Sequence, residues 1–352
     1  MQHYTFPYTE VFHCTAGDCP DSCCKGWEIV IDPKTLQTYQ QTCSPIGETI
    51  RSTLTKNEDD EWMFQNREDG NCPFWNAEKL CDLQIQAGEH LLCDTCRQFP
   101  RIPQDYTLFT EHVLSLACPE AARLVLTQTE PFQAIPLTQA EPSEPINEAE
   151  LPYSLNWMNC LLETRAVLLQ LFQETSIPLA EALCYGLHYV QQFQDWIEEK
   201  TDDFPELQPI TSKPVFLHHE SVQHLYDTLE WMTPEWADWM QQIQQHPVTD
   251  ADLQAFVKIA EPWIPAFRNF CSYYLYLYWL QALNTGNALI QYQKLLTALH
   301  EIAIVSAWKL RETHTYTLTD CMIIVQRYAK EVMHDAENIE KIEDILYNLG
   351  SL

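Results

Sequence analysis

The sequence predicts a mainly α protein, in which an irregular, cysteine-rich, metal-binding N-terminal region is followed by an α-helical domain. Ten of the fourteen cysteines and five of the eight glycines lie within the first 128 residues, among short apolar runs broken by turn signals. From about residue 154 onward, apolar residues recur every three or four positions, which is the period of an α-helix. We therefore expect a cysteine-rich region over 1–128, a linker over 129–152 and a helical domain over 153–352.

The helical half divides into successive predicted helices. The first is expected from about residue 154, with apolar side chains on one face from Leu155 to Phe172. A second begins near Ser176 and Pro178, because proline is favoured in the first turn of a helix, and continues to Ile197. Similar periodic stretches follow at about 219–232, 250–260, 266–284, 287–311, 317–334 and 337–349.

Two helix starts are also predicted within the cysteine-rich region, and a linker follows it. Asp32 is expected to cap the segment that begins at Pro33. Cys118 precedes Pro119 and Glu120, as at a helix N-terminus, where the positive end of the helix dipole is expected to lower the pKa of the thiol. Residues 129–152 are rich in proline, glutamate and alanine, which is typical of a linker or a long surface loop.

The composition excludes several classes of function. The chain carries 50 acidic and 20 basic side chains, a formal charge of −30, and such a field repels nucleic-acid phosphates and anionic lipid headgroups. No run of eighteen apolar residues is present, and the N-terminus lacks a basic region followed by an apolar one. We therefore expect a cytoplasmic protein that binds neither nucleic acid nor membrane. The acidity either attracts cationic partners or only keeps the protein soluble.

In a reducing cytosol, cysteines are expected to bind a metal or to be buried, and not to form disulfides. Turn residues separate the cysteines here into groups, which lets thiolates converge from several directions. The groups are Cys14, Cys19, Cys23 and Cys24, then Cys72 and Cys81, then Cys93 and Cys96, and finally Cys118. The four cysteines after Cys118 are scattered among helical patterns and are interpreted as small core residues: Cys160, Cys184, Cys271 and Cys321.

The spacing of the cysteines by itself does not decide whether they bind zinc or an iron–sulfur cluster. Structural zinc sites usually contain two regular CxxC or CxxH pairs, and the first group here is more widely and less regularly spaced. His13 and His90 are potential nitrogen ligands, although a histidine beside cysteines is more often bonded to the backbone. Trp27 and Trp75 are expected to shield the site from water.

Four segments resemble the flagellin lysine-N-methylase family. They are Cys14–Asp32 (CTAGDCPDSCCKGWEIVID), Cys72–Gln84, Thr95–Arg101 and Leu116–Leu126, which occur in the order of the family and cover about the first third of the chain. The helical remainder fits this family in character but not motif by motif. A related, smaller group of proteins with a CxxCxxCC signature shares the cysteine pattern, but its first cluster is more tightly spaced.

The resemblance implies a cytosolic protein-lysine N-methyltransferase that acts on flagellin, uses S-adenosylmethionine and carries a [4Fe–4S] cluster in its active region. Eight cysteines match the motifs of the family and are the implied ligands: Cys14, Cys19, Cys23, Cys24, Cys72, Cys81, Cys96 and Cys118. One cubane needs only four thiolates, so the others either hold a second metal or are structural. Cys43 and Cys93 lie outside the matched motifs.

Neither common pattern for binding S-adenosylmethionine is present. None of the eight glycines forms a GxG pair, and the Cx3Cx2C spacing typical of radical enzymes is absent. The donor pocket must therefore be of another kind. Arg97, Arg101 and Arg123 are cations close to the cysteines, and they either balance the charge of the cluster, bind the carboxylate of the donor, or are ordinary surface residues.

Methylation of lysine requires a neutral amine, because an ammonium group has no lone pair to attack the sulfonium methyl. Tyr274 and Tyr278 share a helix face at i, i+4, and they either form an aromatic cage for the substrate lysine, with a phenolic group to accept its proton, or pack in the core. The alternative function is non-enzymatic. In that hypothesis, zinc or an iron–sulfur cluster holds the N-terminal region together, and the helical half binds a protein partner.

Overall fold

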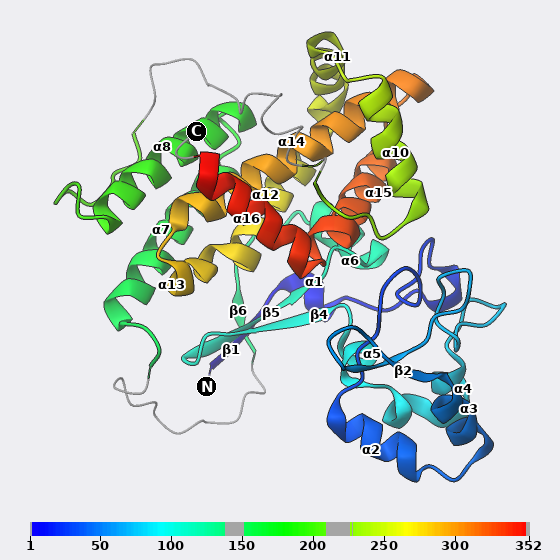
Figure 1. Ribbon diagram of the computed structural model, residues 1–352. Helices are drawn as coiled ribbons and strands as arrows, with labels where there is room; N and C mark the ends of the chain where they lie inside the picture. Colours follow the sequence, from blue (N-terminus) through cyan, green and yellow to red (C-terminus); the bar gives the residue numbers. More distant parts are fainter. Residues whose placement is uncertain (1, 138–150, 209–225, 227, 350–352) are drawn as a thin grey trace.

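The computed structural model describes residues 2–137, 151–208, 226 and 228–349 (Figure 1). The described chain is mainly α-helical, as the sequence predicted. The long helices of the second half lie together above a small β-sheet, and a lobe formed by part of the cysteine-rich region lies beside them (Figure 1). No described helix is both long enough and apolar enough to cross a membrane.

The helical half is organised around one long helix, α14 (Ala288–Thr313). It is buried along most of its length and packs against α8, α11, α12, α15 and α16. Four of these helices are capped at the N-terminus by a side chain that accepts a hydrogen bond from a backbone N–H of the first turn. The capping residues are Ser154 on α7, Thr249 on α11, Asn287 on α14 and Thr317 on α15. The helices of this half are α7 (Leu155–Gln173), α8 (Leu179–Ile197), α10 (Pro234–Gln245), α11 (Asp250–Ala260), α12 (Ile264–Tyr278), α13 (Ala282–Thr285), α14, α15 (Leu318–Tyr328) and α16 (Ala336–Leu349), with short η4 (Glu261–Trp263), η5 (Trp279–Gln281) and η6 (Ala329–Met333).

Most helices predicted in this half are confirmed, with three differences. The stretch predicted over 266–284 is interrupted by η5, and α13 then ends at Gly286 in the left-handed conformation. The stretch predicted over 317–334 ends in a wider π-helical turn, η6. The stretch over 219–232 lies mostly outside the described residues; of its described residues, Tyr226 is helical and 228–232 are not. Helix α10 was not predicted.

A four-stranded sheet, which the sequence did not predict, supports one side of the helical core. Its order is β4-β5-β1-β6, formed by β1 (Gln2–Thr5), β4 (Arg101–Asp105), β5 (Phe109–Leu114) and β6 (Ile135–Pro136). Strand β1 pairs parallel to β5, with Gln2 opposite Phe109, and β4 and β5 form an antiparallel hairpin. Phe6, Val113 and Leu114 are buried in the same core as the long helices. The short helices α1 (Pro7–Glu10) and α6 (Pro119–Leu126) join this core as well.

The remaining part of the cysteine-rich region forms a second, smaller core. It contains Ile29, Ile31, Tyr39, Phe64, Phe74 and Cys93 among its buried residues. The predicted cap is confirmed, since Asp32 Oδ1 accepts from Thr35 N at 2.8 Å, and its other oxygen accepts from Asp94 N at 3.0 Å. Its elements are η1 (Ala16–Asp18), α2 (Pro33–Gln41), α3 (Pro45–Thr53), β2 (Leu54–Lys56), β3 (Trp62–Phe64), α4 (Asp82–Ala87), η2 (Gly88–Leu91) and α5 (Asp94–Gln98).

The two cores do not follow sequence order, because the segments around β1, β4 and β5 pack with the helices and not with the smaller core. The boundaries over 1–128, 129–152 and 153–352 stay a prediction. Within the predicted linker, residues 138–150 lie outside the described residues.

Candidate functional site

The cysteines implied as ligands come from loops and helix starts around the smaller core. Cys81 and Cys93 precede α4 and α5, and Cys118 precedes α6 with Pro119 in the first turn, as predicted. The expected effect on Cys118 is wrong, however. Burial outweighs the favourable helix terminus and raises the pKa of the Cys118 thiol to about 11, to which the sulfurs of Cys19 and Cys23 contribute.

Five thiols form a network against the smaller core: Cys24, Cys72, Cys81, Cys93 and Cys96. A hydrogen bond from Cys23 lowers the pKa of Cys24, but a hydrogen bond to Cys72, burial and the nearby sulfurs of Cys72 and Cys81 together raise it to about 12. The pKa of Cys96 is raised most by its hydrogen bond to Cys93, and the nearby sulfurs of Cys24 and Cys72 raise it further. Thiols that are distant in sequence are therefore neighbours in space.

The other implied ligands are connected to these thiols through Cys23. Cys118 interacts electrostatically with Cys19 and Cys23, Cys19 interacts with Cys14, and Cys23 also interacts with Cys81. Cys43, which was left out of the predicted set, is exposed, and its thiol donates to the Gln41 carbonyl.

The potential metal ligands are chemically suited to a soft metal or a cluster, because they are thiols brought together from several segments. Within the described chain, however, no group of three or more histidine, cysteine, aspartate or glutamate side chains is close enough together to hold a metal ion. The thiols hydrogen-bond to one another instead, from Cys23 to Cys24, from Cys24 to Cys72, and from Cys96 to Cys93. Metal binding requires these protons to leave, and metal binding at the eight cysteines stays a prediction.

Cys93 is a thiol of this network that sequence reasoning left outside the predicted ligand set. It is fully buried, and the hydrogen bond from Cys96 is the main cause that lowers the pKa of its thiol. The CxxC spacing of Cys93 and Cys96 was the available signal, but the match to the motifs of the family included only Cys96.

Two of the three arginines near the cysteines are paired with carboxylates. Arg97 Nη1 lies 2.7 Å from Asp94 Oδ1, and Arg123 makes two hydrogen bonds to Glu120, at 2.8 and 2.6 Å. The hydrogen bond with Glu120 is the main cause that raises the pKa of Arg123. Among the residues that the structure describes, Arg101 makes no ion pair, and its guanidinium lies 5.4 Å from the centre of the Phe12 ring. The predicted role of the three arginines in binding the methyl donor stays a prediction.

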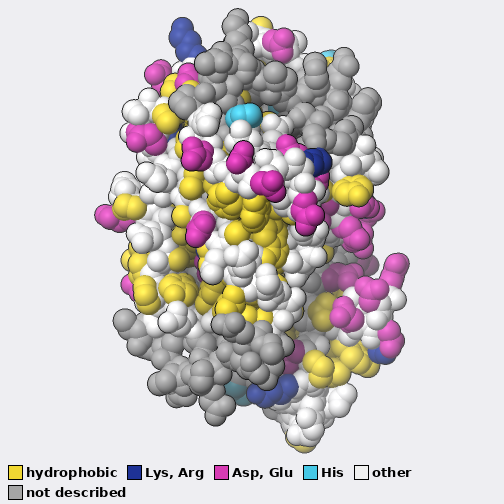
Figure 2. Space-filling view, turned by 90° about the vertical axis from the view of Figure 1, so that its left-hand side faces the viewer, with side chains coloured by type: hydrophobic (Ala, Val, Ile, Leu, Met, Phe, Trp, Pro, Cys, Tyr) yellow, Lys and Arg dark blue, Asp and Glu magenta, His cyan; other side chains and the backbone are white. Residues whose placement is uncertain are grey.

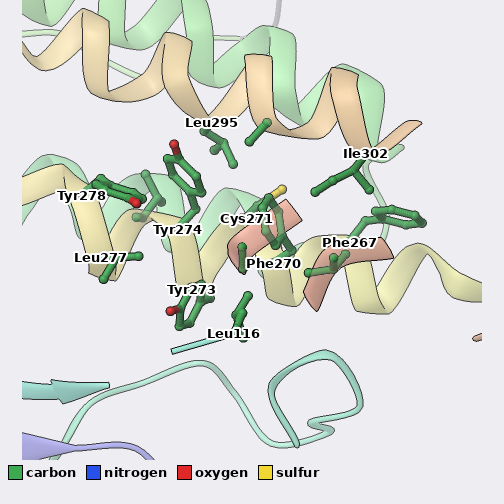
Figure 3. Packing of buried hydrophobic residues seen from close by; sticks show 14 of the residues in the cluster. Leu116, Phe267, Phe270, Cys271, Tyr273, Tyr274, Leu277, Tyr278, Leu295 and Ile302 are labelled. Carbon is green, nitrogen blue, oxygen red and sulfur yellow. The ribbon is translucent and has the colours of Figure 1, made fainter. Parts of the chain in front are cut away.

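Tyr274 and Tyr278 are buried in the larger core (Figure 3), whereas the thiol network packs in the smaller core. Their ring centres are 4.5 Å apart, and Tyr278 Oη donates to the Met333 carbonyl at 3.2 Å. A lysine does lie over this pair, but it belongs to the chain itself: Lys294 Nζ is 4.5 Å from the centre of the Tyr278 ring and pairs with Glu343. Burial raises the pKa of both tyrosines, which therefore keep their protons. Their predicted catalytic role stays a prediction.

Sequence reasoning also missed a row of side chains that joins the helical half to the cysteine loops: Gln326 in α15, Lys330 in η6 and His334 directly after η6, spaced four residues apart. Lys330 Nζ lies 3.0 Å from Asp21 Oδ2 and 5.2 Å from the centre of the Trp27 ring. Burial by itself would raise the pKa of Asp21, but the charge and hydrogen bond of Lys330, together with hydrogen bonds from the Ser22 backbone and Gln326, lower it overall. Asp21 therefore holds the loop of Cys19, Cys23 and Cys24 against the helical half.

The other two members of this row reach two further cysteine segments. Gln326 Nε2 donates to Asp21 Oδ2 at 3.1 Å and to the carbonyl of Ala117, the residue before Cys118, at 2.8 Å. The His334 ring lies 4.5 Å from the Trp27 ring and 6.0 Å from the ring of Phe99, which follows α5. One helical row thus contacts three of the segments that carry the cysteines.

A second contact lies alongside this row. The buried carboxylate of Glu331 accepts hydrogen bonds from Met232 N at 2.6 Å, Thr233 N at 3.2 Å and the Thr233 hydroxyl. Gly26 lies against Thr233 and Lys330. Its backbone φ is +90°, which residues that carry a side chain rarely adopt. The turn after Cys24 therefore fits closely against the segment that precedes α10.

Part of this chain is similar to three curated proteins. The flagellar biosynthetic protein FliU of Salmonella muenchen is 34% identical over 120 residues, which are 33% of this chain and 71% of FliU. The lysine-N-methylases of Salmonella typhimurium and Salmonella choleraesuis are each 34% identical over 120 residues. The chain spans only 30% of the length of these two proteins. No family model and no solved structure matches the chain.

Proposed function

This chain belongs to the family of the flagellar biosynthetic protein FliU and the lysine-N-methylases, and we propose that it transfers methyl groups to lysine side chains of flagellin. The single observation that carries the proposal is the 34% identity with FliU across 71% of that protein. The proposal concerns activity and substrate together, because the relatives are named for lysine methylation and for the flagellum.

The surface charge supports a lysine-rich protein substrate. The chain has a formal charge of −30, and acidic side chains far outnumber lysine and arginine on the face shown in Figure 2. A field of this sign attracts cationic protein surfaces and accelerates their association. Binding of the substrate is therefore expected to weaken as the salt concentration rises.

We further propose that S-adenosylmethionine is the methyl donor and that a [4Fe–4S] cluster is bound by Cys24, Cys72, Cys81 and Cys96. Cys24 interacts with the other three, and Cys72 interacts with both Cys81 and Cys96. With these four thiolates every iron of the cubane would be ligated, so the amino-carboxylate group of the donor would be bound by a cation beside the cluster. Of the three arginines, Arg101 is the one whose charge is not already used by a carboxylate within the described chain.

The test is methylation of flagellin by the full-length protein, purified without oxygen and loaded with iron and sulfide. With S-adenosylmethionine present, we expect flagellin lysines to gain the mass of one or more methyl groups, as measured by peptide mass spectrometry. Flagellin whose lysines have been acetylated beforehand is the matched control and should gain none. If protein that is fully loaded with iron and sulfide leaves flagellin unmodified, the proposed methylase activity is contradicted. The non-enzymatic alternative, in which a metal holds the N-terminal region together and the helical half binds a protein partner, is then favoured.

A further inference from the structure

Three rings lie together where the helical half meets the smaller core, and they are called here the three-ring patch: His334 directly after η6, Trp27 after the first cysteine group and Phe99 after α5. The ring centre of His334 lies 4.5 Å from that of Trp27 and 6.0 Å from that of Phe99. The rings of Trp27 and Phe99 are 5.2 Å apart. These two residues are partly buried and His334 is exposed, so the patch can be reached from outside.

The three-ring patch adjoins two of the segments that carry the proposed cluster ligands. Trp27 Nε1 donates to the carbonyl of Cys23, the residue before Cys24, at 2.8 Å. Phe99 follows α5 three residues after Cys96. A side chain that binds at this patch would therefore lie next to a methyl donor that is bound beside the cluster.

The imidazole of His334 is able to accept a proton. Within the described part of the chain, its ring nitrogens make no hydrogen bond. Burial against its neighbours is the main cause that lowers the pKa of His334, the charge of Lys330 lowers it further, and the charge of Asp335 opposes both. The ring is therefore neutral at neutral pH and has a nitrogen lone pair available for a proton.

Lys330 affects an amine that approaches the three-ring patch. Its ammonium group lies 5.2 Å from the centre of the Trp27 ring, and the ion pair with Asp21 fixes its side chain, which is 3% exposed. The same charge lowers the pKa of His334, so Asp21 does not cancel its field at the patch. A nearby positive charge and the loss of water both favour a neutral amine over an ammonium group. The patch therefore suits a lysine that gives up its proton.

We propose that the three-ring patch binds the side chain of the lysine that is methylated, and that His334 is the base that accepts its proton. The alkyl stem lies against Trp27 and Phe99, and the ammonium group gives one proton to a ring nitrogen of His334. The lone pair of the resulting amine attacks the sulfonium methyl, the bond from that carbon to sulfur breaks, and the thioether leaves. The imidazolium then releases its proton to water. The assignment rests on the proposed function for donor and substrate, but binding of an amine can be measured without it.

In methylation assays with loaded protein, His334→Ala is expected to lower kcat about a hundredfold, which is the contribution of a positioned base. Added imidazole should restore part of the activity by occupying the place of the missing ring. Wild-type kcat should rise with pH through the folded pKa of His334, which lies below the ordinary value of about 6.5, and His334→Ala should lack this step. His246→Ala, at an exposed histidine after α10, is the matched control and should keep the wild-type kcat.

The aromatic wall is tested separately from the base. Phe99→Leu removes a ring that holds the alkyl stem but leaves the imidazole in place. It is therefore expected to raise the KM for flagellin severalfold, more than it lowers kcat. His334→Ala should show the opposite division, with its main effect on kcat.

A further measurement does not depend on methylation. The probe is n-butylamine, which has the length of a lysine side chain, added to the full chain at constant pH. The NMR signals of the His334 ring, identified by their absence in His334→Ala, are expected to shift as the probe binds. Phe99→Leu should weaken this binding severalfold, and the signals of His246 should not shift.

The outcomes separate this inference from the methylase itself. If n-butylamine leaves the His334 signals unchanged, the inference is overturned whether or not flagellin is methylated. If wild-type protein methylates flagellin and His334→Ala, folded by circular dichroism and loaded with iron, keeps the wild-type kcat, His334 is not the base and the methylase stands. If the His334 signals shift but loaded wild-type protein leaves flagellin unmodified, the patch stands as an amine site, and the methylase fails together with the role of His334 as its base.

Discussion

Replacing Cys24 by alanine is expected to remove essentially all iron from the anaerobically purified protein. Cys24 interacts with Cys23, Cys72 and Cys81, and Cys96 in turn interacts with it, so no other thiol has more neighbours of this kind. Loss of a ligand at this position leaves one iron of the proposed cubane without its thiolate and removes the thiol with the most neighbours, so we expect the cluster to be lost. Iron and acid-labile sulfide analysis, together with the visible absorbance of the protein, measures the loss.

Two controls test where the cluster lies. Cys160→Ala, in α7, is expected to keep its full iron content, because Cys160 packs against the larger core and interacts with Glu163. Cys14→Ala is also expected to keep iron, because Cys14 is exposed and lies outside the proposed ligand set. Equal iron in Cys24→Ala and wild type contradicts the proposed ligand set. Colourless wild-type protein with stoichiometric zinc contradicts the cluster.

Replacing Lys330 by methionine is expected to destabilise the fold and also to weaken metal retention. The side chain of Lys330 is 3% exposed, and its removal leaves Asp21, which is 26% exposed, without its ion pair. Breaking a fully buried pair costs about 3–5 kcal/mol, and water reaches Asp21, so we expect a loss of about 2 kcal/mol in the free energy of unfolding. Because Asp21 holds the loop of Cys23 and Cys24, we expect metal affinity to fall about tenfold.

The pH dependence of stability tests the ion pair between Lys330 and Asp21 in a second way. The folded pKa of Asp21 is lowered, so the pair stabilises the protein above the ordinary aspartate pKa of about 3.9, and this contribution is lost as the pH falls through the folded pKa. Urea unfolding of wild type and Lys330→Met should therefore differ at neutral pH and converge in strong acid. Lys341→Met is the matched control, because Lys341 pairs with the exposed Glu230 at 3.2 Å. Equal losses in both lysine variants contradict a special role for Lys330.

Local patterns in the sequence were sufficient for most helices and for two of their starts. Asp32 caps α2, and Cys118 with Pro119 begins α6, because a helix start depends on residues within one turn of each other. The sheet was missed because β1 has four residues and β6 has two, which is too short for an alternating pattern, and β1 pairs with β5 more than one hundred residues away. Local signals contain no information about such a partner.

The sequence by itself determined that the second half is helical, that the cysteines are concentrated in the first third, and that the chain resembles a methylase family. Only the tertiary structure decided that Cys93 belongs with Cys24, Cys72, Cys81 and Cys96, and that Lys330 lies against Asp21, 309 positions earlier in the chain. It also decided that Lys294, and not a substrate, lies over Tyr278. The physical reason is that helix periodicity reflects contacts between residues three or four apart, whereas a site is assembled by packing between segments that are distant in sequence.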